Sequence, residues 1–333
     1  MTNRRAIFLA AKIVFAVAVL CWLFHKVDAG RVWANVRNAE RGPVVLGIGL
    51  CIFTVAIAGW RWQRLLRMLQ INLPLIHLTC IVEIGQFFMM FLPGPIGDDL
   101  TRMLYISRLA PGRVGEACTT VVLDRCVGLA SVLVLAVVCI PWQWNLLATS
   151  PQTHGLALII LSAGVAVCIF GAIFFMTGHP THQWFEKRLR SLPAHSLRDE
   201  VARIWGLLCS NKKPLAQVIG AAMVTQLLLS VVFYLAGLSV GINMPLLSWL
   251  TFVPVVLAAN ALPITIAGLG VREYLLVLFL GVTARVDSER ALAASFVVFA
   301  IISSVCLFGG VLYIFYRPQR KREGSEQNAR PTG

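Results

Sequence analysis

Residues 91–102 have the sequence Phe91-Leu-Pro-Gly-Pro-Ile-Gly-Asp-Asp-Leu-Thr-Arg102, which ends an apolar run with prolines, glycines and three charged residues. A continuous helix cannot pass through this stretch, because Pro93 and Pro95 each lack the backbone N–H that helical hydrogen bonding needs. Inside a membrane such a break is tolerated only where protein or water satisfies the freed backbone groups. The stretch therefore predicts a chain that turns within the membrane instead of crossing it.

A second break has the same plan. Residues 262–273 have the sequence Leu262-Pro-Ile-Thr-Ile-Ala-Gly-Leu-Gly-Val-Arg-Glu273, and again an apolar run ends at a Leu-Pro pair. In each break an arginine follows the proline by nine positions, Pro93 to Arg102 and Pro263 to Arg272. We expect the rest of the chain to form the frame that positions these two breaks.

The composition is that of a helical membrane protein. Of the 333 residues, 58% are hydrophobic and 13% are charged, and several apolar runs reach the length of about 20 residues that crosses a bilayer. The formal net charge is +14, but the basic residues lie between and after the apolar runs, where topology signals and anionic headgroups account for them. We expect no nucleic-acid partner. The nine cysteines form no CxxC motif and no Cys/His cluster, so neither a metal site nor a cofactor is expected.

The charges between the apolar runs predict the topology. Six runs have the length of a full span: about 7–24, 43–60, 117–140, 155–176, 215–240 and 291–316. The first could instead be a signal peptide, but its length and the intervening His25 and Lys26 favour an uncleaved span. Residues 179–214 hold seven Lys and Arg against three acids, as expected in the cytoplasm, and the uncharged residues 141–154 are expected outside. Both termini are then cytoplasmic, with a basic, disordered tail over residues 317–333.

In this topology the two breaks enter the membrane from opposite faces. The order span, hairpin, span then occurs twice in opposite orientations, over about residues 43–140 and 215–316. The predicted fold is an all-α polytopic membrane protein with about six full transmembrane helices and two re-entrant, broken-helix hairpins in inverted repeats, as in alternating-access transporters. Two half-helix N-termini would aim positive charge at a common point, with Arg102 and Arg272 just after them. The two arginines are therefore candidates for a cradle that binds an anionic headgroup.

Three motifs connect these breaks to a known family. The first break holds Pro93, Gly94, Gly97, Asp99 and Arg102, the following span holds Asp124 and Arg125, and the second break holds Pro263, Ile264, Thr265, Gly268, Gly270, Arg272 and Glu273. In these motifs the sequence resembles the flippase-like membrane domain found as the N-terminal transmembrane region of lysylphosphatidylglycerol synthases and as a stand-alone protein. The likeness covers about residues 7–316, which implies one membrane domain over residues 1–316 in the plasma (inner) membrane.

The sequence departs from this family pattern in two places. Pro95 and Asp98 stand where small residues are expected, and Val298 and Phe299 lie where relatives often carry a basic residue. No aminoacyl-transferase domain follows Tyr316 in this sequence. The resemblance therefore implies movement of lipid but not transfer of lysine to lipid.

The candidate substrate-binding residues are Arg102, Arg272, Asp99, Asp124, Arg125, Glu273 and Thr265. Each has a structural alternative. Arg102 could pair with Asp98 one helical turn earlier, and Arg272 with Glu273, to lock the hairpin tips. Asp124 and Arg125 point about 100° apart on a helix and are expected to bind different neighbours. Glu83 could couple transport to protons or could satisfy freed backbone groups or Arg125, and we favour the structural role. The hairpin-break residues Pro93, Gly94, Gly97, Pro263, Gly268 and Gly270 need no chemical role.

The leading functional hypothesis is a transporter of an anionic or lipid-linked amphiphile, either a phospholipid or an isoprenoid-linked lipid, and not an enzyme. One alternative is a membrane glycosyltransferase or lipid-modifying synthase, although residues 179–214 show neither an acidic metal-binding cluster nor a phosphate-binding glycine-rich turn. Another is a non-catalytic partner of envelope-lipid biosynthetic enzymes, with the basic loop and tail as docking sites. No Walker motif is present, so ATP-driven movement would need a partner chain.

Overall fold

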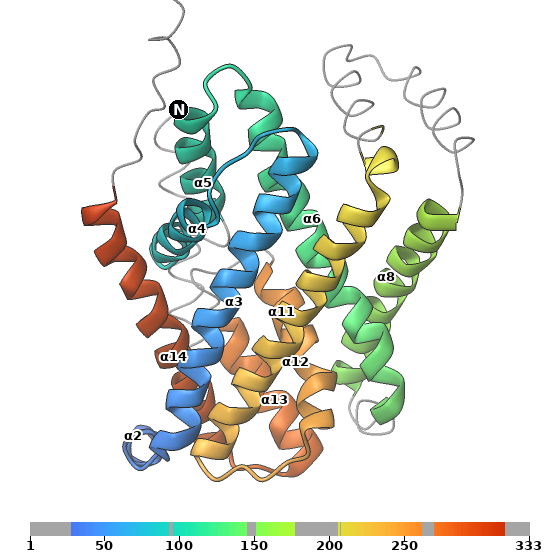
Figure 1. Ribbon diagram of the computed structural model, residues 1–333. Coiled ribbons are helices and arrows are strands. Elements are labelled where there is room, and N and C mark those ends of the chain that lie inside the picture. The colour runs from blue at the N-terminus through green and yellow to red at the C-terminus, as the bar shows by residue number, and fades with distance from the viewer. Residues whose placement is uncertain are drawn as a thin grey trace, which may run out of the picture.

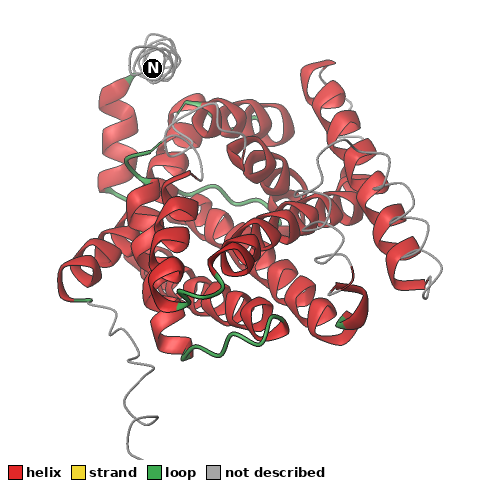
Figure 2. Ribbon diagram, turned by 90° about the horizontal axis from the view of Figure 1, so that it is seen from above, coloured by secondary structure: helices red, strands yellow, loops and turns green. Residues whose placement is uncertain are grey.

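The computed structural model describes residues 28–92, 96–144, 151–176, 206, 208–261 and 270–316. Within these ranges the chain forms helices joined by short loops, and no strand occurs (Figure 2). In chain order the elements are α2 (Ala29–Arg37), α3 (Arg41–Met68), α4 (Leu75–Met89), α5 (Ile96–Leu109), α6 (Val114–Cys139), the 3₁₀ turn η1 (Ile140–Gln143), α8 (Pro151–Met176), α11 (Lys212–Ser239), α12 (Leu246–Ala261), α13 (Val271–Ala284) and α14 (Ser288–Phe315). The all-α prediction is confirmed for this part of the chain.

Five of the described helices are long and apolar enough to cross a membrane. They are Arg41–Met68, Val114–Trp142, Ala157–Met176, Lys212–Ser239 and Ser288–Phe315. These correspond to five of the six predicted spans, and the remaining one, at residues 7–24, lies outside the described residues. Their outer faces carry many exposed large apolar side chains, such as Phe53, Ile159 and Phe308. Such a large apolar surface is unfavourable in water but is expected where a helix faces lipid. The protein is therefore a multi-pass membrane protein.

The helices fall into two sets of four with matching lengths. In the first set, α3, α4, α5 and α6 have 28, 15, 14 and 26 residues, and in the second, α11, α12, α13 and α14 have 28, 16, 14 and 28. At about 1.5 Å per residue, α4 and α12 are each too short to cross a hydrocarbon core of about 30 Å. Each set thus has a long helix, two short helices and another long helix.

The packing of the two sets also corresponds. The α4 helix packs against α3, α5 and α14, and α12 packs against α11, α13 and α6, so each short helix contacts the last long helix of the other set. The long helices α3 and α11 pack against each other across the centre. Figure 1 shows the α4–α5 pair at the upper end of the molecule and the α12–α13 pair at the lower end. The two short-helix pairs therefore lie at opposite ends of one bundle.

The described helices end before each predicted break and begin again after it. The α4 helix ends at Met89 and α5 begins at Ile96, and α12 ends at Ala261 and α13 begins at Val271. Five of the predicted break or site residues lie outside the described residues: Pro93, Gly94, Pro263, Thr265 and Gly268. The predicted tail, residues 317–333, also lies outside them.

Two break glycines that are described have clear backbone reasons. Gly97 lies in the first turn of α5, where an added Cβ would be 2.5 Å from the carbonyl oxygen of Phe88 on α4. Gly270 is the N-cap of α13 and has a φ of 91°, a conformation that side-chain-bearing residues rarely adopt. Each glycine is thus explained by the hairpin itself, as the sequence argument expected.

Close glycine contacts place α4 deep in the bundle. An added Cβ at Gly85 of α4 would lie 2.2 Å from Oδ1 of Asp98, and one at Gly59 of α3 would lie 2.4 Å from Oγ1 of Thr79. Membrane helices associate through such small residues because lipid supplies no hydrophobic driving force between them. The contact at Gly85 brings the Asp98 carboxylate of α5 against the backbone of α4.

Candidate functional site

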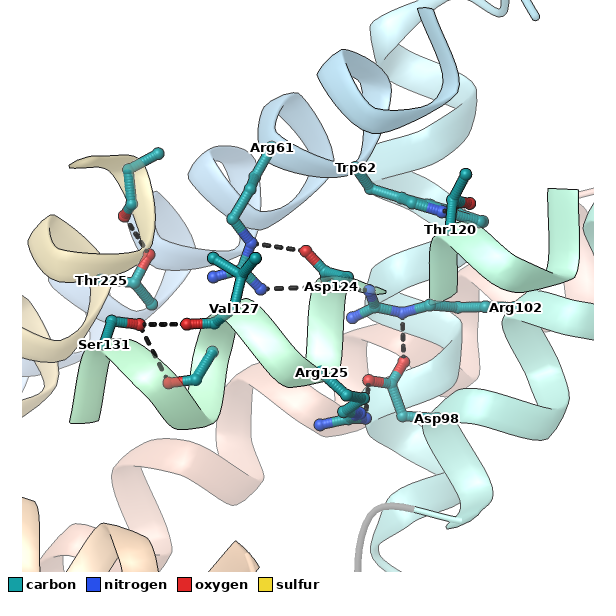
Figure 3. A network of polar contacts seen from close by, with 12 residues as sticks. Arg61, Trp62, Asp98, Arg102, Thr120, Asp124, Arg125, Val127, Ser131 and Thr225 are labelled. Atoms are coloured by element: carbon teal, nitrogen blue, oxygen red, sulfur yellow. Dashed lines mark hydrogen bonds and ion pairs between the residues drawn. The ribbon is translucent and has the colours of Figure 1, made fainter. Parts of the chain in front are cut away.

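Asp124 of α6 is the centre of a buried ion-pair network that joins three helices. Its two carboxylate oxygens accept hydrogen bonds from Arg61 of α3, with Nε to Oδ1 at 2.6 Å and Nη2 to Oδ2 at 2.9 Å (Figure 3). Oδ2 also accepts a hydrogen bond of 2.9 Å from Nη1 of Arg102 on α5. All three side chains are buried. Asp124 therefore ties the α4–α5 hairpin to both long helices of the first set.

Arg102 bridges two aspartates. Its Nε donates to Oδ1 of Asp98 at 2.6 Å, one helical turn earlier, while Nη1 reaches Asp124. The guanidinium also lies over the ring of Trp62, 5.5 Å from its centroid, and the indole N–H of Trp62 donates to Oγ1 of Thr120 at 2.9 Å. Two carboxylates and an aromatic face thus hold the planar Arg102 group in one orientation, which a lysine could not reproduce.

The network ends at Arg125 and Asp99, where its side chains are most exposed. Arg125 of α6 donates from Nη2 to Oδ2 of Asp98 and from Nε to Oδ1 of Asp99, the latter at 2.6 Å. The side chains of Arg125 and Asp99 are 34% and 25% exposed, whereas that of Asp98 is 4% exposed. The series Arg61, Asp124, Arg102, Asp98, Arg125 and Asp99 therefore runs from a closed interior to one accessible end.

This network contains three arginines and three aspartates, so its formal charge is zero. Charges within a membrane protein are costly unless they are paired, and each of these six groups has at least one partner of opposite charge. Hydrogen bonds between charged groups are also stronger than those between neutral groups. An anion that binds at Arg125 would compete with Asp98 and Asp99, the two carboxylates to which this arginine is already bound.

A smaller polar group lies in the second set of helices. The carboxylate of Glu273 accepts hydrogen bonds from the backbone N–H of Gly270 at 2.6 Å and from the hydroxyl of Ser295 on α14 at 3.0 Å. Arg272 donates from Nε to both Glu273 and Ser295 at 3.1 Å, and it lies over the ring of Phe299 at 5.3 Å from the centroid. Glu273 thereby caps the start of α13 and neutralises Arg272 in the same contact.

Comparison with protein families assigns the chain to a family. A family model described as the lysylphosphatidylglycerol synthase TM region matches residues 9–310. The chain belongs to this family. The match covers both sets of four helices except the last turn of α14, and it includes every residue of the two polar groups. Comparison of the chain with curated proteins finds no match.

The structure brings some of the predicted site residues of this family member together and separates others. Asp99, Arg102, Asp124 and Arg125 belong to one network, while Arg272 and Glu273 belong to the second polar group. No ion pair or hydrogen bond joins the two groups among the described residues. Both structural alternatives are present, since Arg102 pairs with Asp98 and Arg272 with Glu273. Asp124 and Arg125 bind different neighbours, as their helical spacing predicts.

Two participants in the network were not expected from the sequence. Arg61, Arg64 and Arg67 follow an apolar run at helical spacing, a pattern typical of the cytoplasmic end of a span, yet the side chain of Arg61 is buried against Asp124. Asp98 was considered only as a local partner of Arg102, yet it also binds Arg125 of α6. An arginine one turn before a basic cluster gives no local signal of a partner 63 residues away. The pairing depends on how α3 and α6 face each other.

No group of three or more His, Cys, Asp or Glu side chains in the described ranges is arranged to hold a metal ion. Glu83 also differs from expectation. We expected it to satisfy Arg125 or freed backbone groups, but Arg125 binds Asp98 and Asp99, and the oxygens of Glu83 accept no hydrogen bond from the described residues. Its surroundings require a separate explanation.

Proposed function

We propose that this member of the lysylphosphatidylglycerol synthase transmembrane-region family moves an anionic or lipid-linked amphiphile between the leaflets of the plasma membrane. The observation that carries the proposal is the arginine–aspartate network between α3, α5 and α6 with one accessible end at Arg125. Ionisable groups inside membrane proteins cluster along the routes taken by polar substrates, because lipid alone would exclude them. A family defined by a lipid synthase's membrane region makes a lipid the natural substrate class.

The network offers a route for a phosphate-containing headgroup. Arg125 is the most exposed arginine of the network, and its fork geometry matches two phosphate oxygens as well as it matches carboxylates. A headgroup phosphate that replaces Asp99 on Arg125 would keep the guanidinium paired throughout the exchange. Arg102 lies further inside the protein, and Asp98 lies between it and Arg125. The acyl or isoprenoid tail would remain in lipid while only the headgroup passes through the protein.

The architecture supports alternating access between two hairpins. The similar helix lengths and corresponding contacts of the two sets support an inverted repeat. Their short-helix pairs at opposite ends support re-entrant hairpins that enter from opposite faces (Figure 1). In such transporters one repeat rocks against the other around a central site. The first hairpin, with Arg102, would then serve the cytoplasmic leaflet, and the second, with Arg272, the outer leaflet.

Purified protein in liposomes is expected to accelerate the exchange of a fluorescent anionic phospholipid between leaflets without nucleotide. Loss of protection from a membrane-impermeant quencher measures the rate. Arg125→Ala is expected to slow exchange about tenfold or more, because one charge-assisted interaction with the headgroup is lost. Arg113→Ala is the matched control, since Arg113 lies just before α6 and pairs with the nearby Glu116 in a partly exposed contact.

Three outcomes of this assay separate the candidate functions. Exchange above the rate of empty liposomes in the wild-type protein, reduced by Arg125→Ala and unchanged by Arg113→Ala, supports lipid transport through the network. Absence of exchange across anionic, zwitterionic and isoprenoid lipids, together with transfer of a sugar or aminoacyl group, would establish an enzyme instead. Absence of both activities, with capture of envelope-lipid enzymes, would favour a non-catalytic partner.

Thiol labelling tests the topology on which the two-hairpin mechanism depends. Cys209 lies just before α11 in the predicted cytoplasmic region, and Gln143 lies in η1 in the predicted external region. Burial raises the pKa of the Cys209 thiol, so labelling should be done at mildly alkaline pH, where more thiolate is present. Cys209 is expected to react with an impermeant reagent only after the cytoplasmic side is opened, and Gln143→Cys only from outside. Cys209→Ser identifies the labelled band, and the reverse pattern would refute the proposed orientation of the repeats.

A further inference from the structure

Glu83 lies on α4 and differs from the other buried acids of the protein. The residue is 4% exposed, and neither of its carboxylate oxygens accepts a hydrogen bond from the described residues. Asp98, Asp124 and Glu273 are equally buried, but each of them is bonded to at least one arginine. The backbone N–H of Gly309 on α14 lies close to the Glu83 carboxylate, but no arginine or lysine of the described residues is paired with it, so Glu83 lacks the ion pairs that make the other three acids tolerable as anions.

The groups that face Glu83 offer it no positive charge. Its titratable neighbours are Cys51 of α3, Cys80 of α4, Cys306 of α14 and Asp98 of α5, which together represent every helix packed against α4. Asp98 is an acid itself and would repel an ionised Glu83. The network arginines do not compensate, because their charge is balanced by three aspartates and none is paired with Glu83.

The contact between α4 and α14 encloses this carboxyl group. An added Cβ at Gly309 of α14 would lie 2.2 Å from the carbonyl oxygen of Glu83, and one at Gly310 would lie 2.7 Å from the ring of Phe87. The two backbones therefore meet where Glu83 lies. Nearby, the Cys306 thiol approaches the side-chain oxygen of Gln86 at 4.0 Å, the outer limit for a sulfur hydrogen bond. Such a closed contact holds a neutral side chain far better than an anion.

These observations point to a proton-binding site. An unpaired anion in such an environment is strongly unfavourable, and the simplest way to remove that cost is to bind a proton. We propose that Glu83 binds a proton when α4 is packed on α14 and that release of this proton loosens the contact at Gly309 and Gly310. If the proposed transport function holds, on which this consequence rests, movement of the α4–α5 hairpin against α14 would couple lipid movement to a proton gradient.

Infrared difference spectroscopy between acidic and alkaline pH tests proton binding directly. The carbonyl band of a protonated, non-hydrogen-bonded carboxylic acid is expected in wild-type protein in lipid nanodiscs and is expected to disappear as the pH rises. Glu83→Gln has nearly the shape of the neutral acid and should fold, but it should lack this band. Glu116→Gln, which removes an acid from a solvent-exposed pair on α6, should retain it. Identical spectra for the wild type and Glu83→Gln would refute the proposal.

Hydrogen–deuterium exchange tests whether protonation controls the helix contact. At each pH the wild type is compared with Glu83→Gln, so that the chemical exchange rate of the amides cancels. The two should agree at acidic pH, and the α4 and α14 amides of the wild type should then exchange about tenfold faster per pH unit once Glu83 ionises, because opening is linked to release of one proton. An equal pH response in both proteins, or a response to sodium at constant pH instead, would overturn the coupling.

Neither readout requires lipid to move. A protein that shows the Glu83 band and the pH-dependent exchange but accelerates no lipid would refute the proposed function and retain the proton site. A protein that moves lipid with the same pH profile in wild type and Glu83→Gln, and shows no Glu83 band, would retain the transport function and refute the proton site.

Discussion

Asp124→Asn is expected to lower the free energy of unfolding by about 3 to 5 kcal/mol, because it leaves two buried arginines without one of their carboxylate partners. Arg61 loses the carboxylate that it binds through two hydrogen bonds, and Arg102 keeps only Asp98. An amide has no charge to offset either guanidinium, and its NH₂ group adds a donor where only acceptors fit. Thermal or denaturant unfolding of the purified protein in nanodiscs measures the loss.

A control variant on α6 shows whether removing any carboxylate from this helix has the same effect on stability. Glu116→Gln removes a carboxylate from the solvent-exposed pair with Arg113 and is expected to cost less than about 1 kcal/mol. The double variant Arg61→Leu with Asp124→Leu should be more stable than Asp124→Leu alone, since it removes the stranded charge together with its partner. Equal stability of Asp124→Asn and Glu116→Gln would show that the network does not hold the α4–α5 hairpin in place.

Arg102→Lys and Arg272→Lys are expected to slow lipid exchange by about tenfold to a hundredfold, since a hydrogen bond to a charged group contributes about 1.5 to 3 kcal/mol. Lysine keeps the charge but offers a single ammonium group, whereas Arg102 bonds to Asp98 and Asp124 through different nitrogens. Arg113→Lys, in an exposed pair, is the matched control and should exchange lipid at the wild-type rate. Thermal unfolding of each variant shows whether lost activity reflects lost structure.

The two arginines are further expected to act on different leaflets. Arg102→Ala should weaken loading of lipid from the cytoplasmic leaflet, and Arg272→Ala should weaken loading from the outer leaflet. Uptake measured separately from each leaflet decides between the alternatives. Equal losses from both leaflets in both variants would leave a shared site but remove the two-gate mechanism. Full activity in both variants would remove the arginines from the mechanism.

An exchange of charges between partners is a poor control at Arg102, and the structure explains why. Transferring the arginine to position 98 would leave an aspartate at position 102 beside Asp124, so a new repulsion would replace the ion pair that is lost. At the second hairpin, Glu273 also accepts the backbone N–H of Gly270, and an arginine there could not accept it. Replacement by lysine keeps the positive charge and therefore tests the role of the branched guanidinium group more directly.

Several features of this protein follow from local chemistry and were predictable from the sequence. Proline lacks an N–H, and the described helices end before Pro93 and Pro263 and begin again after them, although Pro254 lies inside α12 without ending it. Five described spans match apolar runs because the thickness of a bilayer sets their length. The pair of Arg102 with Asp98 and the contact of Glu273 with Gly270 join residues three or four apart, a spacing that a helix brings together by its own geometry.

The partners across helices were decided only by the tertiary structure. Arg61 and Asp124 are 63 residues apart, and Arg125 and Asp98 are 27 residues apart, so their pairing depends on the rotation and crossing of α3, α5 and α6. The burial of Glu83 without an arginine partner likewise arises where Gly309 lets the backbone of α14 approach that of α4 closely. Helix breaks and spans depend on neighbours along the chain, whereas the charge balance of a buried site depends on neighbours in space.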